Sequence, residues 1–182
     1  GDVVRVLRGS GRLTDDAAAS PPRLIEVPAD PAYPDCVFIE DTAVVLPSLP
    51  LGSADADAAS EHVTALITRP GHPSRRGETA AVAAALHGSA MVHRIVATPP
   101  HAALDGGDVL CTGREIFVGV GGGRTDDAGC RAVAAAFPHY PVHAVPMMLG
   151  VRHTRGRHPA ALHLKSLVVA VDERLLIAEA TP

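Results

Sequence analysis

Two acidic residues, Glu40 and Asp41, stand side by side at the end of the segment PDCVFIED, in which Asp35 supplies a third carboxylate. We expect Val37–Ile39 to be a strand, in which neighbouring side chains face opposite sides. At a strand end or in a turn, both carboxylates can converge on a planar cation with several donors, such as a guanidinium. A solvated acidic turn is the alternative, and it is the commoner origin of an isolated Glu-Asp pair.

Two basic residues, Arg75 and Arg76, follow a Pro/Gly turn at the beginning of a predicted helix. The positive end of the helix dipole disfavours cations, so a helix that begins with both arginines invites an anion. A substrate carboxylate held by two parallel hydrogen bonds would meet that need. The alternative is a pair of surface arginines that reach solvent.

The segment LDGGD places two glycines between Asp105 and Asp108. Glycine allows either a positive φ or a close approach of the backbone to another segment, and a plain turn is the alternative. In the segment LHLKS, strand alternation would direct His163 and Lys165 to one side. A histidine there could transfer protons near neutral pH. Because the chain contains ten histidines, a structural histidine packed between leucines is the alternative.

Two further patterns resemble ligand sites but fail on spacing. His153, His158 and His163 recur at equal intervals that share neither a helix face nor a strand face, so we expect no zinc and no other metal. The segment GGGR, which ends at Arg124, lacks the GxxxxGK[ST] pattern of a phosphate-binding loop. We expect this segment to connect a strand to a helix.

The elements that hold these residues must be built on small apolar side chains. Of the 182 residues, 47% are hydrophobic and only 3% are aromatic, which favours one domain rich in Val, Leu, Ile and Ala. The formal net charge of -4 provides no basic surface for nucleic acid or an anionic membrane, and no apolar run is long enough to span a bilayer. We therefore expect a small molecule or a protein as partner. The sequence does not indicate the oligomeric state of the protein.

The three cysteines, Cys36, Cys111 and Cys130, have no CxxC spacing. They fit reduced thiols in the cytoplasm better than a disulfide framework. We expect Cys36 and Cys111 in strands and Cys130 in a helix, where each behaves as a small hydrophobic residue and none acts as a nucleophile.

The apolar segments repeat a β-β-α-β order twice and begin it a third time. Ser74 and Thr125 are predicted to cap the two helices, and Gly88 is predicted to end the first one in the left-handed conformation. The third unit begins with Ser166–Val171 and Arg174–Ala178. The predicted strands of the first two units are Ala43–Leu46, Val63–Thr68, Val92–Ala97, Asp108–Cys111, Glu115–Val120 and Val142–Val145, and the predicted helices are Ala80–Leu86 and Asp126–Phe137.

Three stretches without apolar periodicity divide the chain. Residues 1–22 are predicted to be an unassigned N-terminal segment, and residues 47–60 and 152–159 are predicted to be loop insertions. The remainder, 23–182, is predicted to be one incomplete α/β domain, because the third unit stops before its helix and repeated units must pack on one another. An ordinary α/β sandwich with its last hairpin at the edge is the alternative. The first residue, Gly1, also suggests an incomplete N-terminus.

Together, PDCVFIEDTAVV, TALITRPGHPSRR, LDGGDVLCTGREIFVGV and LHLKS resemble the dimethylarginine dimethylaminohydrolases. Their superfamily also contains arginine deiminases and amidinotransferases, and the resemblance runs from Pro34 to Ser166. It implies an α/β fold, a β/α propeller of five ββαβ modules around a pseudo-fivefold axis, of which this chain would supply about three.

The resemblance implies substrate contacts for five residues. Glu40 and Asp41 would bind the guanidinium, Asp35 the α-amino group, and Arg75 and Arg124 the α-carboxylate of a methylated arginine. No nucleic acid, membrane or cofactor is implied.

The resemblance also implies a Cys-His mechanism. His163 would be the general acid and base, and Asp105 would orient its imidazole and favour the imidazolium. A cysteine thiolate would attack the guanidinium carbon, His163 would protonate the departing dimethylamine, and water would hydrolyse the thiouronium to citrulline.

The nucleophile of the family lies well beyond the histidine motif, whereas no cysteine follows Cys130 in this sequence. We therefore expect the chain by itself to be inactive, and the insertion at 152–159 could displace His163. Two alternatives are a binding protein that retains the arginine site without turnover and a hydrolase like the arginine deiminases.

Overall fold

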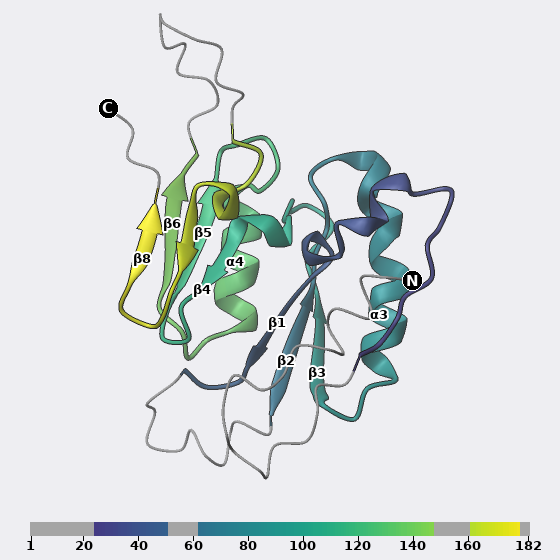
Figure 1. The fold of residues 1–182 in the computed structure, drawn as a ribbon, viewed down its shortest axis with the longest axis horizontal. Helices are drawn as coiled ribbons and strands as arrows, with labels where there is room; N and C mark the ends of the chain where they lie inside the picture. The colour runs from purple at the N-terminus through teal and green to yellow at the C-terminus, as the bar shows by residue number, and fades with distance from the viewer. Residues whose placement is uncertain (1–23, 51–61, 148–160, 179–182) are drawn as a thin grey trace, which may run out of the picture.

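The computed structural model describes residues 24–50, 62–147 and 161–178, and Figure 1 shows them as two neighbouring groups of strands and helices. The first group contains a three-stranded sheet in the order β1 (Ala43–Pro47), β2 (Val63–Ile67), β3 (Val92–Ala97). β1 runs antiparallel to β2, and β3 runs parallel to β2 after the chain has passed through helix α3 (Thr79–His87). This is the predicted β-β-α-β order.

The second group repeats that order. β4 (Val109–Cys111) and β5 (Ile116–Val120) form an antiparallel hairpin, and β6 (Val142–Pro146) returns parallel to β5 after helix α4 (Asp127–Ala136). The turn of the hairpin contains Gly113, whose φ of 92° suits glycine.

A third hairpin, β7 (Val168–Ala170) and β8 (Leu176–Ala178), is antiparallel and forms a sheet of its own. The predicted strands of all three units are therefore present, and each begins and ends within two residues of its predicted bounds.

The core lies between the two three-stranded sheets. Helix α4 contacts β5 and β6 of its own sheet and also β2 of the other sheet. The buried cluster joins Val44 and Leu66 of the first group to Ile116, Val118 and Val133 of the second. One apolar core therefore connects both units, with α4 between them (Figure 1).

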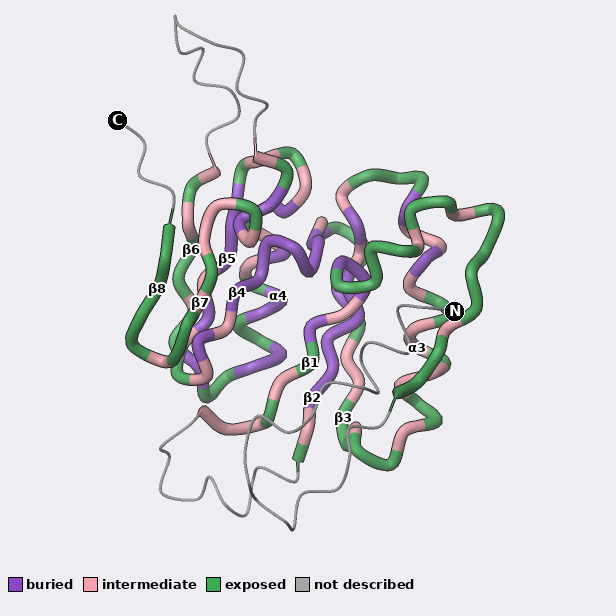
Figure 2. The backbone as a smooth tube through the Cα atoms, viewed as in Figure 1, coloured by how far each residue is buried: buried purple, intermediate pink, exposed green. Residues whose placement is uncertain are grey.

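Burial is distributed unevenly over the molecule (Figure 2). Helix α3 has no buried residue, whereas α4 buries one face. The β7–β8 hairpin exposes Val169, Leu176 and Ile177. Within the described residues, neither helix is long and apolar enough to cross a membrane.

The strand predicted at Val37–Ile39 is wrong. The chain instead forms two 3-10 helices, η1 (Pro34–Val37) and η2 (Ile39–Asp41). Pro34 has a φ suited to a helical turn, and successive backbone bonds then span three residues, from Phe38 N–H to the Asp35 carbonyl and from Thr42 N–H to the Ile39 carbonyl. The apolar side chains that suggested a strand are exposed on these turns.

The predicted beginning and end of the first helix also differ from the structure. A 3-10 helix, η3 (Pro73–Glu78), precedes α3, and the hydroxyl of Ser74 pairs with Nδ1 of His72 at 2.7 Å instead of capping α3. Gly88 ends the helix with a φ of -77°, in the right-handed region, so no left-handed conformation is needed there.

The second helix is capped by Asp126, not by Thr125. The Asp126 carboxylate accepts a hydrogen bond from Gly129 N–H at 2.7 Å. Thr125 is buried and bonds to two aspartate residues of the candidate site.

The predicted segments 1–22 and 152–159 lie outside the described residues. Most of the predicted insertion 47–60 does so as well, but Pro47 is the last residue of β1 rather than the first residue of a loop.

Candidate functional site

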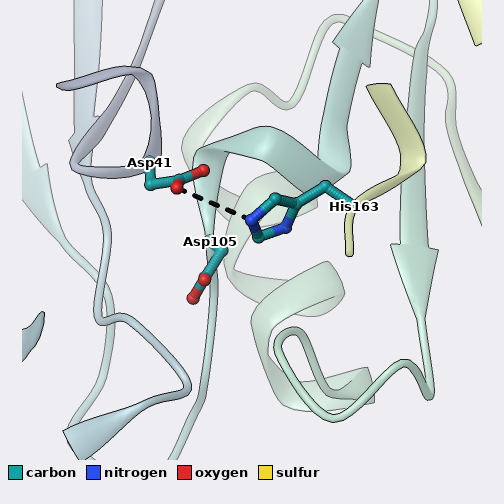
Figure 3. Close-up of side chains that lie close together, drawn as sticks. All are labelled: Asp41, Asp105 and His163. Atoms are coloured by element: carbon teal, nitrogen blue, oxygen red, sulfur yellow. Dashed lines mark ion pairs between the residues drawn. The ribbon is translucent and has the colours of Figure 1, made fainter. Parts of the chain in front are cut away.

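Three buried residues from distant parts of the sequence lie close together where the two units meet the segment that precedes β7 (Figure 3). Asp41 ends η2, Asp105 precedes the 3-10 helix η4 (Gly106–Asp108), and His163 precedes the 3-10 helix η5 (Leu164–Ser166). Their nearest ligand atoms all lie within 4.8 Å of one another. The structure thus brings together three of the predicted site residues.

Gly107 allows Asp41 and His163 to approach each other. Its N–H donates to Oδ1 of Asp41 at 2.8 Å. A Cβ at this position would lie 2.6 Å from the same oxygen and 2.7 Å from Cγ of His163. The close backbone approach predicted for LDGGD is present, whereas positive φ is found at other glycines, not at these two.

His163 is 6% exposed and lies between two carboxylates. Its Nε2 is 3.6 Å from Oδ2 of Asp41, and its Nδ1 is 3.6 Å from Oδ1 of Asp108. These separations are ion-pair contacts, longer than hydrogen bonds, and neither ring nitrogen has a hydrogen-bond partner. Burial lowers the pKa of His163, but Asp108, Asp41 and Asp105 together raise it above its ordinary value. The site therefore favours the imidazolium.

Arg75 neutralises Asp41 by binding the same carboxylate oxygen, Oδ2, that lies nearest to His163. Its Nη1 donates to Oδ2 of Asp41 at 2.7 Å, and its Nη2 donates to Glu78 at the same distance. The bond to Glu78, followed by that to Asp41, raises the pKa of Arg75 in spite of its burial. In this structure the guanidinium predicted to bind an anion is paired with two carboxylates of its own chain.

Asp105 is 0% exposed, and its two oxygens differ in their surroundings. Oδ1 accepts from Gly71 N–H at 2.7 Å, whereas Oδ2 has no hydrogen-bond partner and lies 3.8 Å from Nη1 of Arg124. Burial raises the pKa of Asp105, with a further contribution from Asp41, and Gly71, His163 and Arg124 oppose the rise.

Glu40 and Asp35 lie at the rim. The Glu40 side chain is 60% exposed and pairs with Nζ of Lys165 at 3.0 Å. Asp35 is exposed, and its backbone carbonyl accepts from Arg75. The adjacent residues Glu40 and Asp41 therefore occupy different surroundings, one open to solvent and one buried.

Several residues of the network were not assigned from the sequence. Glu78 stands at i+3 from Arg75, a helical spacing that indicates an ion pair. Asp108 was noted only as the second carboxylate of LDGGD, and Thr125 only as a cap. Lys165 was expected on the side of His163 but without a partner.

The grouping of Asp41, Asp105 and His163 has a spacing that a metal ion could bridge. The charge of Asp41 is already balanced by Arg75, however, so a cation would compete with a guanidinium held at 2.7 Å. The absence of a metal stays a prediction. His153 and His158, which were considered for zinc, lie outside the described residues.

The thiols are free and partly buried. Burial raises the pKa of Cys111 in β4 and of Cys130 in α4, which disfavours the reactive thiolate. Cys36 lies in η1, not in the strand predicted for it.

A cavity of about 470 Å³ lies between the segment that contains η1 and the junction of η3 with α3. It is formed mainly by apolar residues between 27 and 39 together with Gly77, Glu78, Ala81 and Val82. Asp41, Asp105 and His163 do not line it.

No family model matches the chain. The N(G),N(G)-dimethylarginine dimethylaminohydrolase of Streptomyces coelicolor is 39% identical over 150 residues, which are 82% of this chain and 47% of the relative. The putative hydrolase DDAH2 of Homo sapiens is 45% identical over 111 residues, 60% of this chain and 38% of the relative. This chain is a dimethylarginine dimethylaminohydrolase-like protein. It spans less than half the length of these curated relatives.

Solved structures agree on the fold. A mutant of DDAH from Pseudomonas aeruginosa in complex with citrulline superposes with a TM-score of 0.59 and 24% identity, covering 82% of this chain and 48% of that chain. The ternary complex of AgrE with ornithine and NAD+ gives a TM-score of 0.59 at 18% identity, covering 82% of this chain and 18% of that one. The described residues thus match part of the α/β fold of these enzymes.

Proposed function

We propose that the complete protein hydrolyses Nω-methylated arginine to citrulline and dimethylamine by a Cys-His mechanism. The observation that carries this proposal is His163, buried between carboxylates that favour its protonated form, in a chain 39% identical to a dimethylarginine dimethylaminohydrolase. The citrulline bound by the DDAH of Pseudomonas aeruginosa is consistent with the proposed product.

The charges around His163 suit the proposed chemistry. As an imidazolium, His163 donates a proton to the departing dimethylamine after a thiolate has added to the guanidinium carbon. As a neutral imidazole, it then accepts a proton from the water that cleaves the carbon–sulfur bond. Asp105 supports the imidazolium by its charge, as the resemblance implies.

The binding of a guanidinium to Asp41 has a counterpart within the chain. The guanidinium of Arg75 is held at 2.7 Å by the Asp41 carboxylate. We propose that the substrate guanidinium binds Asp41 and Glu40, with Asp35 on its α-amino group and with Arg75 and Arg124 on its α-carboxylate. Arg75 would then exchange an internal carboxylate for that of the substrate.

None of the three cysteines is proposed as the nucleophile, because two have raised thiol pKa values and the third lies in an exposed 3-10 turn. We propose that the thiolate comes from outside these 182 residues and that the chain alone does not turn over substrate. The proposed whole is a propeller of five ββαβ modules, supported by the two repeated units, the third hairpin and the partial coverage of the relatives.

The decisive experiment measures citrulline release by the full-length protein from asymmetric dimethylarginine and from arginine. We expect turnover of dimethylarginine and its loss in His163→Gln. The matched control is His143→Gln, which changes an exposed histidine of β6 paired with Glu115 and should retain activity. A folded full-length protein that releases no citrulline from dimethylarginine contradicts the proposal, and turnover of arginine alone favours a function like that of the arginine deiminases.

A second candidate function is binding of guanidinium amino acids without turnover. It is favoured by the acidic cluster that already holds a guanidinium and by the lack of an assigned nucleophile among the described residues. Titration calorimetry of the 182-residue chain with dimethylarginine tests it. Saturable binding abolished by Asp41→Asn supports the binding function, and the absence of heat in a folded chain contradicts it.

A further inference from the structure

Asp108 is tied to two different segments by hydrogen bonds. Its Oδ1 accepts from the backbone N–H of Leu164 at 3.0 Å, and its Oδ2 accepts from the Thr125 hydroxyl at 2.7 Å. Leu164 directly follows His163, and the same Oδ1 lies 3.6 Å from Nδ1 of the ring. One carboxylate therefore holds the backbone beside His163 and faces its imidazole.

Thr125 fixes the direction of that carboxylate. Its hydroxyl oxygen accepts from Asp105 N–H at 3.1 Å while its proton is donated to Asp108. A hydroxyl has a single proton. Because the Thr125 oxygen accepts from Asp105 N–H, that one proton is donated to Asp108. Thr125 is 2% exposed, so its hydroxyl is shielded from bulk solvent.

Asp105 has other structural partners. One of its oxygens is bound by Gly71 N–H, and the other is nearest to Arg124. Its carboxylate lies within 4.8 Å of His163, farther than the 3.6 Å contacts of Asp108 and Asp41. The three carboxylates around the ring thus differ in distance and in what holds them.

We infer that Asp108, held in place by Thr125, is a positioning residue for His163. It faces Nδ1 of the His163 ring and thereby directs Nε2 of the same ring toward Asp41. The importance of this orientation for proton transfer rests on the proposed function. Asp105 then supports the imidazolium by charge and holds Arg124 and the Gly71 turn. The charged groups that face the ring are Asp41, Asp105 and Asp108, with the guanidinium groups of Arg75 and Arg124 behind the first two.

The test is NMR spectroscopy of the 182-residue chain with 15N-labelled histidine, in which His163→Gln identifies the signals of His163. We expect Asp108→Asn to lower the titration midpoint of His163 by about one pH unit or more, because it removes an opposite charge near Nδ1, and to change the tautomer ratio of the neutral ring. Asp105→Asn removes the same charge and is the matched control. Its expected shift is smaller.

Thr125 provides a milder pair of variants. Thr125→Val keeps the shape but removes the hydroxyl and should shift the midpoint in the same direction by less, whereas Thr125→Ser should restore the wild-type value. The inference is overturned by a larger shift in Asp105→Asn than in Asp108→Asn, or by an unchanged midpoint in Asp108→Asn. If Asp108→Asn does not fold by circular dichroism, an unchanged midpoint in Thr125→Val overturns it. Absence of citrulline release together with the expected titrations would count against the proposed function alone.

Discussion

The two β-β-α-β units have the same strand order but secure their helices differently. In the second unit, α4 buries Val133 and Ala136 in a core that also contains Phe137. In the first unit, α3 buries no residue, and the η3 turn that leads into it is secured by the buried guanidinium of Arg75 between Glu78 and Asp41. The helix of the second unit is therefore held by apolar packing, and the turn that leads into the helix of the first unit is held by ion pairs.

The difference shows where the fold is shaped by the site. Desolvation offsets much of the attraction within a buried ion pair, so apolar packing of similar volume stabilises a fold at least as well. In the first unit, however, the arginine that secures η3 also neutralises Asp41 beside His163. Charges therefore replace apolar packing at the place where the proposed chemistry requires carboxylates.

The largest effect is expected in the apolar unit. Phe137 is 1% exposed and packs edge-on against Tyr140, so Phe137→Ala should lower the free energy of unfolding by about 3–5 kcal/mol. Leu86→Ala in the half-buried α3 is the control, and its expected cost is about 1 kcal/mol. Urea denaturation measures both. Equal losses would remove the distinction between the two helices.

The charged unit should depend on its ion pairs. Glu78→Gln keeps the shape of the side chain but takes one of two counter-charges from buried Arg75, and we expect a loss of about 3 kcal/mol. The control is Glu115→Gln, which changes the exposed pair with His143 and should cost less than about 1 kcal/mol. If both substitutions have similar small effects in urea denaturation, charges do not secure η3.

The junction between the units should tolerate no added volume. A methyl group at Gly107 would meet Oδ1 of Asp41 and Cγ of His163, so Gly107→Ala should cost about 2 kcal/mol. At Gly88 the nearest atom is 3.6 Å from an added Cβ, so Gly88→Ala should be neutral or stabilising. Thermal unfolding of the two variants provides the comparison, and an unaffected Gly107→Ala would show that the junction can open.

The strands were predictable because they are short runs of mostly apolar and β-branched residues, and such runs are buried almost continuously in β2 and β5. The 3-10 turns were not. In residues 37–39 the β-branched side chains favour a strand, but the helical turn that begins at Pro34 and the consecutive three-residue hydrogen bonds override that local preference. Ser74 and Thr125 have the residue type of a helix cap, yet their hydroxyls bond to His72 and Asp108 instead.

The sequence predicted which residues belong to the site better than it predicted their hydrogen-bond and ion-pair partners. Asp41, Asp105 and His163 stand in motifs that indicated a site, and they do meet. Their hydrogen-bond and ion-pair partners come from segments that are distant in sequence, as Asp108 is from Leu164 and Arg75 from Asp41. No local pattern encodes such pairs, because tertiary packing decides which carboxylate faces which donor.

Stability should fall as the pH rises above neutral. The folded-state pKa of His163 is raised above its ordinary value of 6.5, so the stabilisation from its imidazolium is fully present below pH 6.5 and is lost as the pH passes the raised value. The slope for this single proton is at most about 1.4 kcal/mol per pH unit. Urea denaturation between pH 6 and pH 9 measures it, with His163→Gln as the reference. An identical pH dependence in both proteins would contradict the raised pKa.

The smallest effect on stability is expected at the rim, where Lys165 pairs with Glu40 at 3.0 Å. Because both side chains reach solvent, Lys165→Met should cost less than about 1 kcal/mol in urea denaturation.

The same substitution frees the Glu40 carboxylate, so a guanidinium ligand should bind more tightly, which calorimetry with arginine measures. Arg114→Met is the control, since it breaks a similar exposed pair, with Glu173, at 3.7 Å. A large loss of stability in Lys165→Met would instead place the rim pair with the buried charges that secure η3, and weaker binding would show that Lys165 itself contacts the ligand.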